Sequence, residues 1–331
     1  MVNTSEASLS NPMEKAMLSL EGLSIGDAFG QMFFGKTDLM LAMIGHRALP
    51  ASPWFITDDS IMAIGLVETL QEKGHVDQDL LAQRFAENYE INPNRGYGGM
   101  AHRILLSIGQ GMDWREVAPA VFDGSGSYGN GGAMRVAPLG GYFADASEES
   151  SEESVIERLI HEARHSAEVT HSHIEGQAGA IAVALAAYWA WTHRQDKHPE
   201  HRAKGAEQGK SMLAFVRDRL PDTETQAGIH NAYKLPFSYS VETAVSALGN
   251  GTRLSAQDTV PFALWCAGRH INSFEDALWA TVQGLGDRDT TCAIVGGVVA
   301  LSVGYAGIPA EWQKSRETLN DWKSRGSASC D

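Results

Sequence analysis

The chain has 331 residues, of which 43% are hydrophobic, 20% are charged and 8% are aromatic, and its formal net charge is −15. These proportions exclude an intrinsically disordered chain and are typical of a soluble globular protein. The negative charge argues against non-specific binding to nucleic acid or to an anionic membrane, but it leaves room for one anionic ligand in a local pocket.

Neither a targeting segment nor a membrane span is predicted. The first residues, MVNTSEASLSNPMEKAM, lack the basic start and apolar core of a signal peptide. The longest apolar runs, 178–191 and 292–307, fall short of the roughly 20 residues that a membrane-spanning helix needs. The three cysteines are scattered and form no CxxC pair, so neither a disulfide framework nor a zinc site is indicated. We therefore expect a cytoplasmic protein.

Apolar residues recur at spacings of three and four along most of the chain, which is the pattern of helices. Alternating, strand-like runs are nearly absent. The pattern predicts an all-α fold: a single compact multi-helix domain over residues 12–315, with terminal extensions at 1–11 and 316–331. In chain order, the helices are expected near residues 13–30, 60–71, 79–90, 154–171, 178–191, 211–220, 240–249, 274–286 and 292–307.

The first unusual element is FITDDSIMAIGLVETL, in which Thr57, Asp58 and Asp59 stand directly before an apolar helix. Threonine and aspartate favour helix starts, so simple capping is one interpretation. A cap needs one or two such side chains, however, and this site offers three. Carboxylates gathered at a buried place repel one another unless a cation neutralises them, so a metal site is the second interpretation.

The next element is the glycine-rich loop that begins at Ser127 and continues through Tyr128, Gly129, Asn130 and Gly131. Such a loop can turn its amides toward a phosphate, with a helix opening at the following alanine. An ordinary glycine turn without a ligand is the alternative. The loop is not a P-loop, because no GKS or GKT follows it.

Further along, THSHIEGQAGA places His171 and His173 just before a helix of small residues. Residues two apart do not share a helix face, so a metal site built from both is not predicted. His171 is either a partly buried histidine bonded to the backbone or a ring that contacts a ligand.

The last element, GDRDTT at 286–291, repeats the acidic pattern before a second apolar helix. We expect the two acidic segments to meet and to hold two hard cations, Mg²⁺ or Mn²⁺, because carboxylates and hydroxyls are the ligands these ions prefer. The expected ligands are Thr57, Asp58, Asp59, Asp287, Asp289 and Thr290. Two such ions can orient sugar hydroxyls and activate water.

Taken together, six blocks in this order resemble the ADP-ribosylglycohydrolase family, typified by dinitrogenase reductase-activating glycohydrolase. They are GLSIGDAFG (22–30), TDDS (57–60), GYGG (96–99), SYGNGGAMRVAPLG (127–140), TH (170–171) and GDRDTT (286–291). The resemblance implies an all-α fold with a cleft for two Mg²⁺ or Mn²⁺ ions. It also implies that Ser127, Tyr128, Gly129, Asn130 and Gly131 hold the diphosphate and distal ribose of ADP-ribose, and that His171 lies against this ligand.

The activity implied is hydrolysis of ADP-ribose from a modified protein side chain, with arginine favoured. Many family members carry a glutamate shortly after the GDAxG turn, whereas this chain has Phe34 at roughly that position, so Asp58 or Asp289 is expected to act as acid and base. Two alternatives stay open. One is a hydrolase of small compounds such as O-acetyl-ADP-ribose. The other is a non-catalytic protein that binds an ADP-ribosylating toxin or an ADP-ribosylated partner.

Overall fold

The computed structural model describes residues 11–144, 151–194 and 205–323. In these ranges it contains helices and two isolated β-bridges but no strand, which confirms the all-α prediction. None of the described helices combines the length and the apolar character that a membrane crossing requires. The α-helices are α1 (Pro12–Gln31), α2 (Thr37–Gly45), α3 (Asp58–Lys73), α4 (Gln78–Ile91), α5 (Gly99–Gly109), α6 (Trp114–Val117), α7 (Gly131–Met134), α8 (Ala137–Tyr142), α9 (Glu152–Glu168), α10 (Ile174–Thr192), α11 (Gly205–Arg217), α12 (Glu224–Lys234), α13 (Val241–Leu248), α14 (Ala256–Arg269), α15 (Phe274–Val282), α16 (Arg288–Val303) and α17 (Ala310–Ser315).

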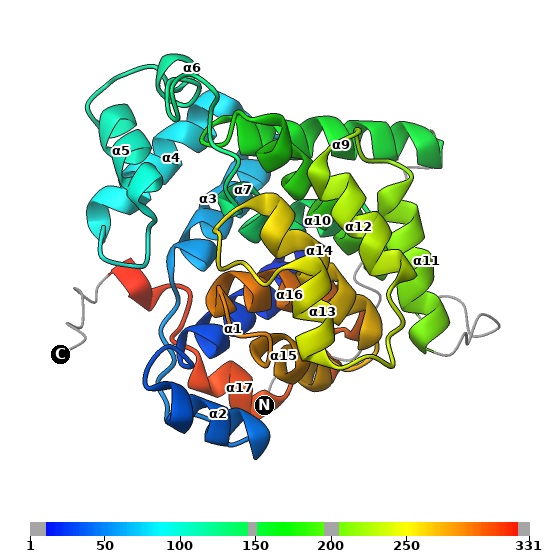
Figure 1. Ribbon diagram of the computed structural model, residues 1–331. Helices are drawn as coiled ribbons and strands as arrows, with labels where there is room; N and C mark the ends of the chain where they lie inside the picture. Colours follow the sequence, from blue (N-terminus) through cyan, green and yellow to red (C-terminus); the bar gives the residue numbers. More distant parts are fainter. Residues whose placement is uncertain (1–10, 145–150, 195–204, 324–331) are drawn as a thin grey trace.

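The centre of the fold is formed by α1 and α16, which come from opposite ends of the chain and lie side by side (Figure 1). Three glycines at four-residue spacing on α1 allow this contact. A Cβ atom at Gly22, Gly26 or Gly30 would lie 2.1 to 2.4 Å from a main-chain oxygen of α16. No side chain fits in that space, so the two helix backbones touch and the two acidic segments lie close to them.

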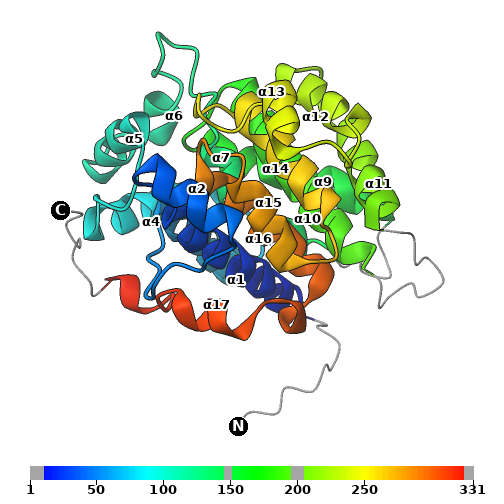
Figure 2. The same ribbon diagram turned by 60° about the horizontal axis from the view of Figure 1, so that its bottom comes forward.

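The remaining helices surround this pair. Figures 1 and 2 show α4, α5 and α6 on one flank of the molecule and α11 and α12 on the opposite flank. Helix α10 is buried along nearly its whole length, as expected for the small apolar residues of its sequence. Two 3-10 helices, η2 (Tyr305–Gly307) and η3 (Asp321–Lys323), follow α16.

An aromatic cluster fixes the C-terminal end of α1. Phe29 stacks on Trp312 of α17 with ring centroids 4.5 Å apart and meets Trp279 of α15 edge-on at 5.0 Å. Phe33 meets the same Trp279 at 5.7 Å. These fully buried rings hold the end of α1 against two later helices.

The described part of the predicted C-terminal extension packs against the domain. Glu317 and Trp322 are buried, and the Glu317 N–H donates to the carbonyl of Trp54 at 2.9 Å. The Glu317 carboxylate accepts from the Ile56 N–H at 2.8 Å and forms a buried ion pair with Arg95. Residues beyond 315 therefore belong to the same packed body up to the end of the described range. The predicted N-terminal extension, apart from Asn11, and residues 324–331 lie outside the described residues.

Candidate metal centre

The two acidic segments meet, as the sequence predicts. Thr57 is the N-cap of α3 and Asp287 is the N-cap of α16, so both helices present their first turns to the same place. Carboxylate oxygens of Asp59 and Asp289 lie within 4.8 Å of each other and of an oxygen of Asp27. Because the helix N-termini also carry partial positive charge, they favour carboxylates at this position.

Asp27 is a member of this cluster that sequence reasoning missed. It lies in the interior of α1 and is fully buried. Its carboxylate accepts hydrogen bonds from the Thr57 N–H at 2.9 Å, the Thr57 hydroxyl at 2.7 Å and the Ser60 N–H at 3.2 Å, and from the Ser60 hydroxyl. Asp27 therefore fixes the start of α3 as well as contributing an oxygen. The signal in the sequence was the place of Asp27 in the GLSIGDAFG block (22–30), one of the six blocks that carry the family resemblance.

The other predicted ligands surround this triad. The Asp58 N–H donates to the Arg95 carbonyl at 2.7 Å, and the Asp58 carboxylate faces Gly96, where a Cβ would lie 3.0 Å from its Oδ1. Gly96 has φ +95, which favours glycine in any case. Asp287 accepts from the Asn130 side-chain amide at 2.7 Å. Thr290 is buried, and its N–H donates to Asp289 at 2.9 Å.

The electrostatics of the cluster are unfavourable for the carboxylates alone. Burial and neighbouring carboxylates raise the pKa of Asp58 to about 8, and burial raises the pKa of Asp27 to about 6 against opposing hydrogen bonds. Burial is also the largest cause of the raised pKa values of Asp59, Asp287 and Asp289. The buried guanidinium of Arg135 acts on Asp58 in the opposite direction, but it is one cation against five carboxylates.

These residues fit a hard divalent cation. Asp59 Oδ1 is buried and has no hydrogen-bond partner among the described residues, although its other oxygen lies 3.1 Å from the Thr57 hydroxyl. An orphaned buried carboxylate oxygen is costly unless a cation binds it. All the donors are oxygens, which suit Mg²⁺ or Mn²⁺ and do not suit zinc or copper.

We expect the metal-free protein to lose stability as the pH rises from about 4 to about 8. Carboxyl groups with raised pKa values bind more protons in the folded than in the unfolded state, so the free energy of unfolding falls as pH rises through that window. Thermal unfolding in the presence of a chelator measures this slope. The Asp58→Asn variant should show a shallower fall than wild type, and equal slopes for the two proteins would contradict this account of Asp58.

The glycine-rich loop runs beside Asp287 and is tied to the start of α14. The Asn130 N–H donates to the Leu254 carbonyl at 3.1 Å, and the Gly129 N–H donates to the Ser127 hydroxyl at 3.2 Å. These two amides are engaged within the protein and are not free to bind a ligand. The helix opens at Gly131, two residues earlier than expected. The assignment of this loop to substrate stays a prediction.

Two exposed aromatic rings and a cavity lie beside this loop. Tyr128 and Phe122 are 38% and 43% exposed, and their ring centroids are 5.2 Å apart. Tyr128 also lines a cavity of about 750 Å³, together with Asn250, Arg253 and Asp258. The carbonyl of Asn250 accepts from the Asp287 N–H at 3.1 Å, so the wall of the cavity is hydrogen-bonded directly to the acidic segment GDRDTT.

Phe34 packs against Arg288, the first residue of α16. Its ring is 44% exposed, and the guanidinium of Arg288 lies 4.9 Å from the ring centroid. Arg288, which separates Asp287 from Asp289, also donates to the Phe33 carbonyl at 3.1 Å. An aromatic ring and a cation therefore lie together at the start of α16.

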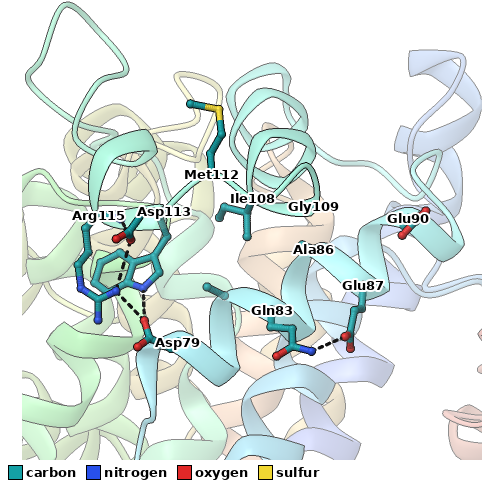
Figure 3. A pocket seen from close by; sticks show the side chains of 12 residues that line it. Asp79, Gln83, Ala86, Glu87, Glu90, Ile108, Gly109, Met112, Asp113 and Arg115 are labelled. Carbon is teal, nitrogen blue, oxygen red and sulfur yellow. Dashed lines mark hydrogen bonds and ion pairs between the residues drawn. The ribbon is translucent and has the colours of Figure 1, made fainter.

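A second groove, of about 490 Å³, lies between α4 and the α5–α6 segment (Figure 3). Its polar side chains already bond one another: Asp79 accepts from Trp114 at 2.8 Å and from Arg115 at 2.7 Å. Gln83 donates to Glu87 at 2.7 Å. None of the residues that line this groove belongs to the acidic cluster or to the 127–131 loop, so we do not place the functional site in this groove.

Comparisons with known proteins agree with this geometry. A model of the family described as ADP-ribosylglycohydrolase matches residues 8–326. The chain is 29% identical to ADP-ribosylhydrolase ARH3 of Homo sapiens, over 90% of this chain and 88% of that protein. It is 30% identical to ADP-ribosylhydrolase ARH3 of Bos taurus, over 90% of this chain and 87% of that protein. A solved structure described as "ADP-ribosylglycohydrolase-related protein complex" has the same fold, with a TM-score of 0.63, 22% identity and 96% of each chain covered.

Proposed function

The chain belongs to the ADP-ribosylglycohydrolase family, and on that premise we propose that it removes ADP-ribose from a modified protein side chain in a metal-dependent reaction. It is an enzyme that hydrolyses a glycosidic bond of ADP-ribose. The observation that carries the metal dependence is the triad of Asp27, Asp59 and Asp289, whose oxygens lie within 4.8 Å of one another and include one without a partner among the described residues.

Two Mg²⁺ or Mn²⁺ ions would be held by Asp27 together with the six predicted ligands, Thr57, Asp58, Asp59, Asp287, Asp289 and Thr290. When bound, such ions supply Lewis acidity that fixes the ribose hydroxyls and lowers the pKa of water. Asn130 keeps Asp287 in place through its 2.7 Å hydrogen bond. This second role of Asn130 comes in addition to the contact with ADP-ribose that the sequence predicts.

Asp58 is the better candidate for the proton shuttle. Asp58 lies outside the tight triad and faces the Gly96 loop, whereas Asp289 is inside the triad. In our proposal the Asp58 carboxylate takes a proton from the attacking water and returns it to the leaving atom of the modified side chain. Asp289 then serves mainly to hold metal.

ADP-ribose fits the surroundings of the cluster. The exposed rings of Phe122 and Tyr128 offer a stacking surface for adenine, and the adjoining cavity of about 750 Å³ is large enough for a nucleotide. Gly131, Gly132 and His171 would contact the diphosphate and distal ribose. The negative potential of the cluster supports arginine as the modified residue, because a guanidinium leaving group is cationic.

We expect the protein to release free ADP-ribose from an ADP-ribosylated arginine peptide when Mg²⁺ or Mn²⁺ is present, and to stop when a chelator is added. A parallel reaction with O-acetyl-ADP-ribose tests the small-molecule alternative. Tight binding of ADP-ribose in calorimetry without release from either substrate would contradict the proposed reaction.

A further inference from the structure

A buried arginine begins a chain of hydrogen bonds that ends at His171. Arg135 is fully buried, and its guanidinium lies 4.5 Å from the ring centroid of Phe85. Its Nη2 donates to the Ser166 carbonyl at 2.7 Å and to the Thr170 hydroxyl at 3.0 Å, and its Nη1 donates to the Gly131 carbonyl at 3.0 Å. The guanidinium therefore connects the turn before α10 to the glycine-rich loop.

The position of the Thr170 proton follows from this chain. Arginine can only donate, so the Thr170 oxygen is the acceptor in its bond with Arg135. The Thr170 hydroxyl also lies 2.7 Å from Nδ1 of His171. Thr170 is only 1% exposed, and no other acceptor for its proton is present among the described residues, so the hydroxyl donates to Nδ1. In a neutral imidazole the hydrogen must then be on Nε2.

The histidine is neutral, because burial and the charge of Arg135 lower the pKa of His171 to about 3. Its Nε2 edge faces the glycine-rich loop. A Cβ atom at Gly129 would lie 3.2 Å from Nε2, and one at Gly131 would lie 2.9 Å from it. No hydrogen bond from Nε2 to a protein acceptor is found in the described part of the chain. The donor therefore lies where the loop is expected to hold ligand.

We propose that Arg135 and Thr170 are positioning residues that fix His171 as the Nε2–H tautomer, so that this ring donates a hydrogen bond to an oxygen of the ADP-ribose diphosphate or distal ribose. This inference rests on the proposed function for the identity of the ligand. The tautomer itself rests only on the Arg135–Thr170–His171 chain. A ring in the other tautomer would present a lone pair to the phosphate oxygens and repel them.

Nitrogen NMR of the wild-type protein labelled at histidine tests the tautomer without any ligand. At neutral pH we expect His171 to show a protonated Nε2 and an unprotonated Nδ1. The His171 signal is identified by its loss in His171→Ala. A protonated Nδ1 would overturn the proposal, and so would an imidazolium with both nitrogens protonated.

Calorimetry with ADP-ribose and Mg²⁺ tests the consequence. Thr170→Val should weaken binding about tenfold, the value of one well-placed hydrogen bond, whereas Thr170→Ser keeps the hydroxyl and should bind within about twofold of wild type. In a His171→Ala background, Thr170→Val should have no further effect, because Thr170 acts through the ring. Equal losses in both backgrounds would assign Thr170 a merely structural role.

The two hypotheses fail differently. If wild-type protein does not bind ADP-ribose, the proposed function is wrong while the NMR result still decides the tautomer. If wild type binds and Thr170→Val binds equally well, the proposed function stands and the positioning role is wrong. Thermal unfolding of each variant checks its fold, and the NMR experiment needs no Thr170 variant at all.

Discussion

Asp59→Asn is expected to lower the rate of ADP-ribose release by on the order of a thousandfold or more, because several kcal/mol of transition-state stabilisation depend on the metal ligands. Asp59 is 2% exposed, and its Oδ1 has no hydrogen-bond partner among the described residues. In our proposal this oxygen binds the metal ion. Asparagine keeps the shape of the side chain and removes its charge. Single-turnover release of ADP-ribose at saturating Mg²⁺ measures the effect.

The same variant should gain stability in the absence of metal. Four other carboxylates crowd Asp59, and removing one charge relieves their repulsion. We therefore expect a higher melting temperature than wild type in chelator and a smaller rise on adding Mg²⁺. Asp218→Asn, a change at an exposed carboxylate paired with Arg217, serves as the matched control and should alter neither quantity. Near wild-type turnover in Asp59→Asn would show that Asp59 is not a metal ligand and serves only at the start of the helix.

Glu317→Ala is expected to cost about 3–5 kcal/mol of folding free energy, because it leaves the charge of Arg95 buried without its partner. The Glu317 side chain is 0% exposed and that of Arg95 is 9% exposed. Arg95 also donates to the Ile56 carbonyl at 2.9 Å, and its own carbonyl accepts from Asp58. We therefore expect weaker Mg²⁺ binding as well as lower stability. Urea unfolding and calorimetry with Mg²⁺ alone measure the two effects.

Two controls separate the buried pair from an ordinary ion pair. Asp218→Ala removes a pair with Arg217 in which the aspartate is 56% exposed, and it should change stability by less than about 1 kcal/mol. Adding Arg95→Met to Glu317→Ala should recover part of the loss, since no uncompensated charge remains. A loss in Glu317→Ala no larger than in Asp218→Ala would show that the buried pair contributes little.

The sequence was sufficient to predict the helical fold and the meeting of the acidic segments. Thr57 and Asp287 are typical helix-start residues, and the apolar runs after them have helical spacing. The starts of α3 and α16 could therefore be predicted from local signals. Their approach to one another could be inferred because buried carboxylates need a common cation.

What the sequence did not predict depends on tertiary contacts. Asp27 is in the interior of a helix, where no capping or loop signal marks it, and only the packing of α3 against α1 gives it Thr57 and Ser60 as partners. Helix α14 was also missed, since Pro261 lies inside it. A proline in a helix interior usually ends the helix. Here the largely buried helix keeps its form with Pro261 against Gly228 of α12, where a Cβ would lie 2.5 Å from the proline ring.

The three glycines of α1 have a consequence for ion selectivity. Asp27 and Asp289 belong to two helices whose main chains already touch, so the separation of their main chains is set by backbone atoms rather than by side chains. Calcium forms bonds to oxygen of about 2.3–2.6 Å, whereas magnesium requires about 2.0–2.1 Å. We expect a main-chain contact of this kind to resist the wider spacing that calcium needs. Selection of the smaller ion would then depend on a main-chain contact between α1 and α16 that extends beyond the ligands themselves.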